Sequence, residues 1–270
     1  CTLTISGEGS LKATGGVGAG IGASSMRKGS LGTIVINGGN IEAYGSGMAA
    51  GIGGGLEGSI GTIVINGGTV YAKGGHGSYS GDIKNVYGGA GIGGGAYGCV
   101  DKIEINGGNV TAYGGYATNA RHPGAAIGTG GGGAKPVEGG YKYGDIEING
   151  GTVSAIAYNN EVYAIGIGVK PGQALQEGTL EGSISISDQA VVNLNGGDYF
   201  PKSENFELKK YTIQGTIADG RFTESSYPVT ISVGEITWDA GTMKVSGYQG
   251  TLTASNYLKP LTAGTQVTVK

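Results

Sequence analysis

Proline, charge and long apolar runs are all scarce in this chain of 270 residues, and each shortage argues against a class of protein. Only 6 prolines and no Gly-X-Y register exclude collagen, although 61 residues are glycine. Charged residues make up only 14%, and valine and isoleucine recur at regular places, which disfavours disorder. The longest apolar runs are far shorter than the roughly 18 residues of a membrane-spanning helix. The glycines therefore indicate a tight turn that recurs along the chain.

An excess of charge of either sign is also missing, since the formal net charge is −3. This near-neutral balance gives no reason to expect nucleic acid or a membrane surface as a partner. The chain opens on Cys1 in a strand-like segment without a signal-peptide pattern, and it ends in another strand-like run, 265–270. We therefore expect an excised module of a larger protein.

One phrase, Ile-Asn-Gly-Gly, dominates the sequence. It occurs at 36–39, 65–68, 105–108 and 148–151, with degenerate copies at 5–7 and 186–187. Successive copies are 31, 29, 40, 43 and 38 residues apart. Self-similarity at such a period is typical of solenoids and other repeat folds.

Each copy follows the same order of short segments. An alternating strand, such as 61–65, leads into the Asn-Gly-Gly turn, and a second strand of the pattern apolar-x-Ala follows at 11–13, 41–43, 70–72, 110–112 and 153–155. A glycine-rich bend then leads to a third short strand centred on Ile21, Ile52, Ile92, Ile127 and Ile167. Three strands and three bends per repeat predict one coil of an all-β, right-handed parallel β-helix (β-solenoid) of about six coils.

Period-two alternation predicts which residues point into this β-helix. Stacked coils would form interior columns from Ile36, Ile65, Ile105 and Ile148 and from Ala43, Ala72, Ala112 and Ala155. A third column would contain Asn37, Asn66, Asn106 and Asn149. Repeated asparagine can indicate a metal or sugar site, but a ladder of asparagines that bond to each other and to the turn is the simpler interpretation. Asparagine and the glycines after it tolerate the left-handed backbone of such a turn.

Coil length varies in three loops, 74–89, 114–124 and 128–144, and insertions on a solenoid usually mark its binding face. From Asp198 onward glycine thins out and charged residues become more frequent. We therefore predict β-helix repeats over 1–197 and a C-terminal cap or small β-subdomain over 198–270, because a solenoid must cover its last open edge. Cys1 and Cys99 would lie several coils apart, so we expect them to be unpaired. A disulfide between them, or a lipid anchor on Cys1 in the full protein, is the alternative.

Neither catalysis nor metal binding is predicted from the charged residues and histidines. The aspartates are scattered, calcium loops are absent from the sequence, and His76 and His122 lie in different loops. Glu104 and Glu147 share an outward column on adjacent coils, close to the carboxylate spacing of a retaining glycosidase. Val35 continues that column and nothing buries either carboxylate, so two solvated surface groups are the simpler interpretation. We expect no enzyme, no metal and no cofactor.

Tyrosine is unusually abundant, with 16 residues against 3 phenylalanines and 1 tryptophan. Many tyrosines fall on outward strand positions or in the long loops, where a rigid amphipathic ring offers a sugar both stacking area and a hydroxyl. Surface aromatics that only favour β-strands are the alternative. The predicted ligand-binding residues are Tyr44, Tyr71, Lys73, Tyr79, Tyr87, Tyr113 and Tyr116. Loops 74–89 and 114–124 would wall a groove over this face.

The repeat Ile-Asn-Gly-Gly-x-Val-x-Ala at 65–72, followed by Gly-Ala-Gly-Ile-Gly-Gly-Gly at 89–95, is similar to repeats in surface and secreted proteins of gut bacteria. Across 1–197 this pattern most resembles the β-helical module attached to xylanases of herbivore-gut bacteria, carbohydrate-binding module family 89. The resemblance implies binding of xylan without catalysis. It rests on the repeat pattern, which adhesin-like proteins share, and it assigns no binding residue in this chain.

We therefore expect a non-catalytic carbohydrate-binding module, secreted or on a bacterial cell surface. It would bind a plant cell-wall polysaccharide, with xylan as the first choice, and target a covalently linked glycoside hydrolase to it. A structural or adhesive β-helix of a bacterial surface protein is one alternative, and such a stalk would have coils of more uniform length. A β-helix polysaccharide lyase or hydrolase is the other, and it would release sugar products.

Overall fold

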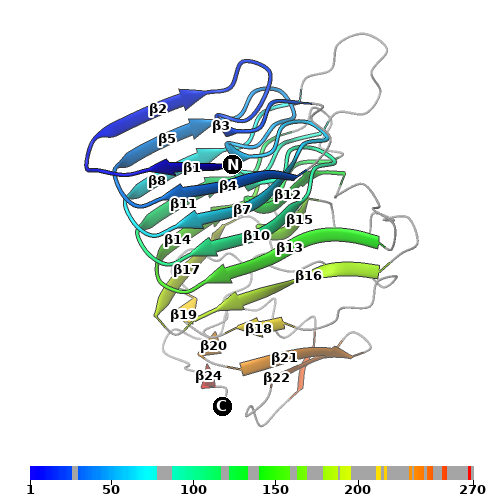
Figure 1. Ribbon diagram of the computed structural model, residues 1–270. Coiled ribbons are helices and arrows are strands. Elements are labelled where there is room, and N and C mark those ends of the chain that lie inside the picture. The colour runs from blue at the N-terminus through cyan, green and yellow to red at the C-terminus, as the bar shows by residue number, and fades with distance from the viewer. Residues whose placement is uncertain are drawn as a thin grey trace.

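The structure is a computed structural model. It describes residues 1–25, 30–77, 87–116, 122–132, 140–158, 163–168, 179–187, 189–195, 211–213, 216–217, 231–232, 234–239, 242–245, 251–253 and 267–268. The regular secondary structure of these residues consists of β-strands alone. The strands stack in layers from the N-terminus to the C-terminus (Figure 1).

Successive coils contribute strands to three sheets. The first sheet contains β1 (Thr2–Ile5), β4 (Ser30–Ile36), β7 (Ser59–Ile65), β10 (Val100–Ile105), β13 (Gly140–Ile148) and β16 (Thr179–Ile186). The second contains β2 (Ser10–Thr14), β5 (Asn40–Tyr44), β8 (Thr69–Lys73), β11 (Asn109–Tyr113), β14 (Gly151–Ile156) and β17 (Ala190–Asn195). The third contains β3 (Ile21–Gly22), β6 (Ile52–Gly53), β9 (Ile92–Gly93), β12 (Ile127–Gly131) and β15 (Ile165–Gly168).

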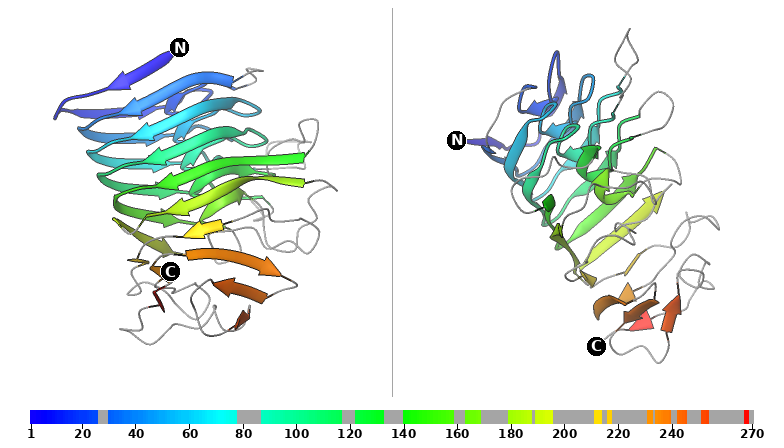
Figure 2. Two further views of the ribbon diagram at one scale, coloured as in Figure 1. Left: turned by 60° about the horizontal axis from the view of Figure 1, so that its bottom comes forward. Right: turned by 90° about the vertical axis from the view of Figure 1, so that its right-hand side faces the viewer.

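Neighbouring coils pair in parallel in all three sheets, so the chain folds as a parallel β-helix, as predicted. The described residues form five three-stranded coils and a sixth coil that contains β16 and β17. Both views in Figure 2 show the coils stacked along one axis, with like strands side by side. Each coil is therefore one layer, and residues at equivalent positions of successive coils form columns.

The interior consists of these columns. Ile36, Ile65, Ile105 and Ile148 pair in register and are fully buried, which confirms the first predicted column. Ala43, Ala72, Ala112 and Ala155 form the second and are also fully buried. Burying each isoleucine contributes about 1.5–3 kcal/mol. The alanines bury little surface themselves, but their size lets the coil turn tightly.

The asparagines of the turns form an exposed ladder of hydrogen bonds, as predicted. Nδ2 of Asn66 donates to Oδ1 of Asn37 at 2.8 Å. Nδ2 of Asn106 donates to Asn66, and that of Asn149 donates to Asn106, both at 2.9 Å. Asn37 in turn donates to Oγ of Ser6 at 3.1 Å, which continues the ladder into the first coil.

The left-handed backbone of each turn belongs to a glycine and not to the asparagine. The second glycine of the Asn-Gly-Gly phrase has a φ of +92° at Gly39 and +91° at Gly68. Among the described residues only Glu57 and Tyr97 combine a side chain with positive φ. Asparagine is therefore present for its side-chain hydrogen bonds, and glycine for the backbone.

The third sheet brings the backbones of neighbouring coils into close contact. Its glycine column has φ values between +117° and +134° and consists of Gly22, Gly53, Gly93, Gly128 and Gly166. A Cβ atom on Gly53 would clash with the carbonyl oxygen of Gly93, and one on Gly93 would clash with that of Gly128. Only glycine combines this backbone conformation with this contact.

The isoleucine column of the same sheet differs from the prediction in the fifth coil. Ile127 pairs with Ile165 and not with Ile167, which is another buried residue of β15. The order Ala-Ile-Gly around Ile165 repeats the order around Ile127. The Gly-Ile-Gly motif around Ile167 therefore lies two residues beyond the position that aligns with the motifs of the earlier coils.

The predicted loop 128–144 was placed too widely. Residues 128–131 belong to β12 and residues 140–144 belong to β13, so the connection between these strands is shorter than predicted. Strand pairing extends both elements, because Gly131 pairs with Gly168 and Gly140 pairs with Thr179. Cys1 and Cys99 do not form a disulfide, as expected.

Strands also occur beyond residue 197. The parallel stacking continues with β18 (Tyr211–Ile213) on β16 and with β19 (Thr216–Ile217) on β17. The pairing then becomes antiparallel through β21 (Gly234–Asp239), β22 (Thr242–Val245) and β23 (Thr251–Thr253), while β20 (Ile231–Ser232) pairs with β24 (Val267–Thr268). The division between repeats and cap at residue 198 stays a prediction.

We expect Gly93→Ala to destabilise the fold by about 2–4 kcal/mol, because the new Cβ requires strained backbone and pushes two coils apart. Gly16→Ala is the matched control, since a Cβ at Gly16 meets nothing within 4 Å. Thermal unfolding of both variants measures the difference. Equal melting temperatures would show that the glycine contact does not set the coil spacing.

Candidate functional site

The outward side chains of the second sheet form two neighbouring columns that contain most of the predicted binding residues. One column contains Tyr44, Lys73 and Tyr113 in register. The other contains Glu42, Tyr71 and Thr111. The two columns bring together four of the seven predicted residues, namely Tyr44, Tyr71, Lys73 and Tyr113.

Three tyrosines of these columns touch one another and form what we call the first aromatic row: Tyr44, Tyr71 and Tyr113. The ring centroids of Tyr44 and Tyr71 are 5.6 Å apart, and those of Tyr71 and Tyr113 are 5.2 Å apart. All three rings are half-buried, because each leans on its neighbour at an angle of 41° to 43°. The row runs along the helix axis and crosses three coils.

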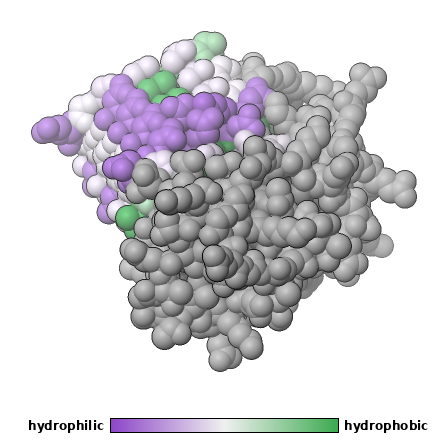
Figure 3. Space-filling view, turned by 90° about the horizontal axis from the view of Figure 1, so that it is seen from below, coloured by the Kyte–Doolittle hydropathy of each residue, from purple (hydrophilic) through white to green (hydrophobic). Residues whose placement is uncertain are grey.

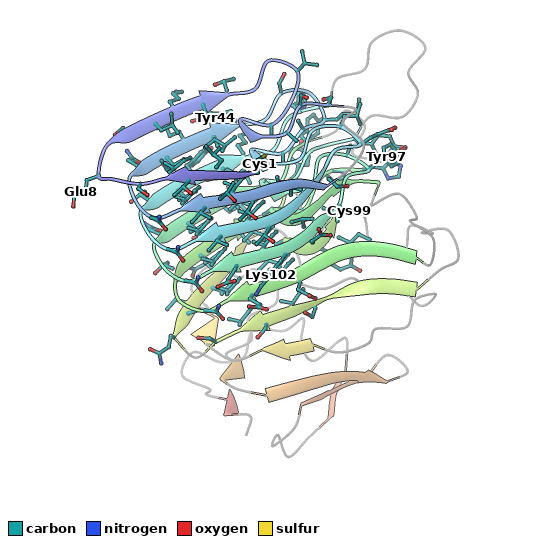
Figure 4. The ribbon with its side chains drawn as sticks, viewed as in Figure 1. Cys1, Glu8, Tyr44, Tyr97, Cys99 and Lys102 are labelled. Carbon is teal, nitrogen blue, oxygen red and sulfur yellow. The ribbon has the colours of Figure 1, made fainter. Side chains whose placement is uncertain are left out.

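Two charged residues, Glu42 and Lys12, contact Tyr44, which Figure 4 labels at the N-terminal end of the first aromatic row. The Tyr44 hydroxyl donates to Glu42 at 3.1 Å, and Nζ of Lys12 lies 3.4 Å from the same carboxylate. Nζ of Lys12 also lies 5.2 Å from the centre of the Tyr44 ring, within the range of a cation–π contact. Glu42 is thus already neutralised by protein groups.

A second aromatic row lies where the chain leaves the second sheet. It consists of His76, Tyr116 and Tyr158, from the third, fourth and fifth coils. His76 and Tyr116 stack at 4.6 Å with an interplanar angle of 12°, and the centroids of Tyr116 and Tyr158 are 4.2 Å apart. Tyr158 is 48% exposed, His76 is also exposed, and Tyr116 is half-buried.

Sequence reasoning identified only Tyr116 in this row. It treated His76 as a loop residue and did not single out Tyr158. The sequence does contain a sign of this row: His76 and Tyr158 each lie shortly after the end of a second-sheet strand, as Tyr116 lies shortly after β11. His76 and Tyr116 both follow their strand after a Gly-Gly dipeptide, whereas Tyr158 follows Ile156 after a single residue.

The bases of loops 74–89 and 114–124 lie side by side, as predicted. The amide of Gly77 donates to the carbonyl of Tyr116 at 3.0 Å, and the amide of Gly88 donates to that of His122 at 2.9 Å. Tyr79 lies outside the described residues, as do 78–86 and 117–121, so the groove that these loops would wall stays a prediction.

Tyr87 lies elsewhere than the sequence suggested. Its side chain is only 7% exposed, because the ring stacks on His122 at 4.7 Å and packs against Tyr97 at 4.5 Å. Its ring therefore offers a ligand very little surface. Tyr87 connects the bases of the two loops, because it forms a β-bridge with His122.

The environment keeps the exposed phenols protonated. Partial burial raises the pKa of Tyr71, with further contributions from Tyr113 and Tyr44. Desolvation, followed by the hydrogen bond to Glu42, raises the pKa of Tyr44, and desolvation beside Tyr116 raises the pKa of Tyr158. These hydroxyls therefore stay protonated over the whole physiological pH range, and the proton of Tyr44 is donated to Glu42.

The carboxylates proposed as a possible catalytic pair lie on the other side of the coil, on the outward face of the first sheet. Glu104 and Glu147 are in register as predicted, and Nζ of Lys102 lies 3.1 Å from one and 3.0 Å from the other. A hydrogen bond from Asn106 and the ion pair with Lys102 lower the pKa of Glu104. A general acid needs a raised pKa, so this geometry opposes that role.

The described residues contain no group of three or more potential metal-binding side chains. No helix long and apolar enough to span a membrane occurs in the described ranges. Seen from below, hydrophilic residues gather in one patch on the described surface (Figure 3).

Comparison with known proteins supports the fold. A family model described as a beta helix repeat matches residues 3–25, 34–56 and 103–131, which lie in the first, second and fourth coils. Comparisons with curated proteins and with solved structures gave no match. The repeat model carries the fold alone, so the function must be argued from the surface.

We expect Lys102→Met to raise the pKa of Glu104, because it removes an ion pair and leaves two carboxylates in adjacent coils without a cation between them. NMR titration of the Glu104 carboxyl carbon measures the change. The ordinary pKa of a glutamate is about 4.3. In the parent, the lowered pKa of Glu104 stabilises the fold at a pH above that value, and this stabilisation is lost as the pH falls through the pKa of Glu104 in the folded state. The free energy of unfolding of the variant should therefore fall less on acidification than that of the parent.

Lys12→Met is the control, since Lys12 lies on the second sheet and should leave Glu104 unchanged. A Glu104 pKa that stays low in Lys102→Met would show that the hydrogen bond from Asn106 alone accounts for it.

Proposed function

We propose that this chain is a non-catalytic carbohydrate-binding β-helix, and that the outward face of the second sheet binds the glycan. The observation that carries the proposal is the pair of aromatic rows on this face. Both rows run along the helix axis and cross adjacent coils, so similar contacts recur at each layer. A polysaccharide repeats in the same way, and each additional sugar would meet another aromatic ring.

The chemistry of the face suits a sugar. The rings offer apolar surface to sugar C–H groups, and the protonated hydroxyl of Tyr71 offers a hydrogen-bonding group next to it. Thr111 and Ser154 add small polar groups in the column of Tyr71. A purely adhesive or structural surface has no need for two continuous aromatic rows on one side.

For the ligand we propose a plant cell-wall β-glycan, with xylan as the first candidate because of the repeat resemblance. For the absence of catalysis, the support is that Lys102 pairs with both Glu104 and Glu147 and that the pKa of Glu104 is lowered by the hydrogen bond from Asn106 and by Lys102. In the parent protein the module would direct an attached glycoside hydrolase to its polymer, in a secreted or cell-surface setting.

We expect the double variant Tyr113→Ala, Tyr116→Ala to bind polysaccharide about tenfold more weakly, because it breaks both aromatic rows. Affinity gel electrophoresis on xylan, mannan, β-glucan and pectin measures the loss. The double variant Tyr113→Phe, Tyr116→Phe is the matched control, since it keeps the rings and removes only hydroxyls. It should retain more binding than the alanine variant.

Each alanine also removes ring contacts worth about 0.5–1.5 kcal/mol, so the melting temperature must be measured alongside. A folded alanine variant that migrates like the parent would place the site elsewhere. A parent that none of the four polymers retards would contradict carbohydrate binding itself and favour the adhesive alternative.

A further inference from the structure

Lys73 has an unusual position within the candidate site. It occupies the middle of the outward column between Tyr44 and Tyr113, directly paired with both. Its side chain is exposed, in contrast to the half-buried rings of the coils above and below. Adjacent coils are about 4.8 Å apart, so Lys73 lies one layer from Tyr44 and one layer from Tyr113, two tyrosines of the first aromatic row.

Lys73 also differs from the other lysines in its partners. Of the lysines whose side chains the structure describes, Lys12 is paired with Glu42, and Lys102 is paired with Glu104 and Glu147. Lys73 has no carboxylate partner among the described residues. The other two cations are therefore compensated, and this one is available to a ligand.

The charge of the surrounding face points the same way. The outward charged residues of β2, β5, β8 and β11 are Lys12, Glu42 and Lys73. Because Lys12 and Glu42 neutralise each other, the face carries one net positive charge in a chain whose formal net charge is −3. The positive charge is thus concentrated where the tyrosines are.

We propose that this face selects a glycan that carries uronic acid, with Lys73 as the residue that contacts the carboxylate. The inference rests on the proposed function and narrows its ligand to acidic polysaccharides. A uronic acid offers the chemistry that the face complements: an apolar ring surface for the tyrosines, hydroxyls for the phenols, and one carboxylate within reach of a single ammonium group.

A nucleic acid would make different demands. A phosphate backbone carries a charge at every step and is bound through several cations. The described face has one uncompensated lysine, and the chain as a whole is acidic. A polymer with a carboxylate on only some of its sugars matches this charge density better.

The test compares two forms of one polymer with the whole chain. Glucuronoxylan and the same glucuronoxylan after reduction of its carboxyl groups to alcohols differ only in charge. We expect the parent to bind the acidic form more tightly at low salt, and the advantage to shrink as sodium chloride is added. Isothermal titration calorimetry or affinity electrophoresis gives both affinities.

Lys73→Gln should weaken binding of the acidic form about three- to five-fold at low salt and leave the reduced form nearly unchanged, as expected for a surface charge pair. Lys73→Arg should restore the preference, since it keeps the charge. Lys102→Gln is the matched control on the first sheet and should behave like the parent.

The outcomes separate the two proposals. If the parent binds both forms equally, the selection of uronic acid is wrong although carbohydrate binding stands. If the parent prefers the acidic form and Lys73→Gln keeps that preference, the assignment of the carboxylate contact to Lys73 is wrong. If neither form nor any neutral glycan binds, the proposed function fails. A single-stranded DNA oligonucleotide that binds as tightly as glucuronoxylan would show a general preference for anions and overturn the proposal.

Discussion

The close contact between glycines on the third side of the coil is the constraint on which the rest of the structure depends. The amide of Ile52 donates to Gly91 at 3.0 Å, and that of Ile92 donates to Ala126 at 2.9 Å. These bonds form only because no Cβ separates Gly53 from the carbonyl of Gly93. A slip of one residue would break them and turn the buried isoleucines outward. The glycines thus fix both the spacing and the register of the coils.

A fixed register converts every recurrence in the sequence into a row in space. The interior positions must repeat because they fill the same volume in every coil, so isoleucine and alanine recur there. Outward positions have no such requirement and can differ from coil to coil. On the first sheet one outward column contains Val35, Val64, Glu104 and Glu147 in succession. The fold therefore does not require tyrosine at these outward positions, and only some coils have it.

The sequence predicted the columns well because two local rules determine them. Alternation with period two decides which side chains point inward, and the repeated turn aligns the coils, so the Ile36 and Asn37 columns were predicted correctly. The errors arose where the repeat is irregular. Ile167 was preferred to Ile165 because its flanking glycines match the motif, although the pairing of β12 with β15 aligns the other residue.

The same limit applies to the candidate site. Tyr44, Lys73 and Tyr113 lie on strands, where counting residues is enough to place them. Tyr158 lies in a bend, where coils of different length cannot be aligned by counting. The burial of Tyr87 depends on His122, which lies in another loop, and no local pattern contains that contact.

The two faces with charged side chains illustrate why one of them is the better candidate for binding. On the first sheet Lys102 pairs with both Glu104 and Glu147, so the cation of this cluster is already engaged by protein carboxylates. On the second sheet the half-buried rings contact each other, and the exposed Lys73 has no carboxylate partner among the described residues. Because the backbone of the coils fixes the spacing of these groups, a ligand would not have to order them on binding. The aromatic row with Lys73, unpaired within the described part of the chain, is therefore suited to binding a ligand, whereas the ion pairs of Lys102 with Glu104 and Glu147 are suited to stabilising the fold.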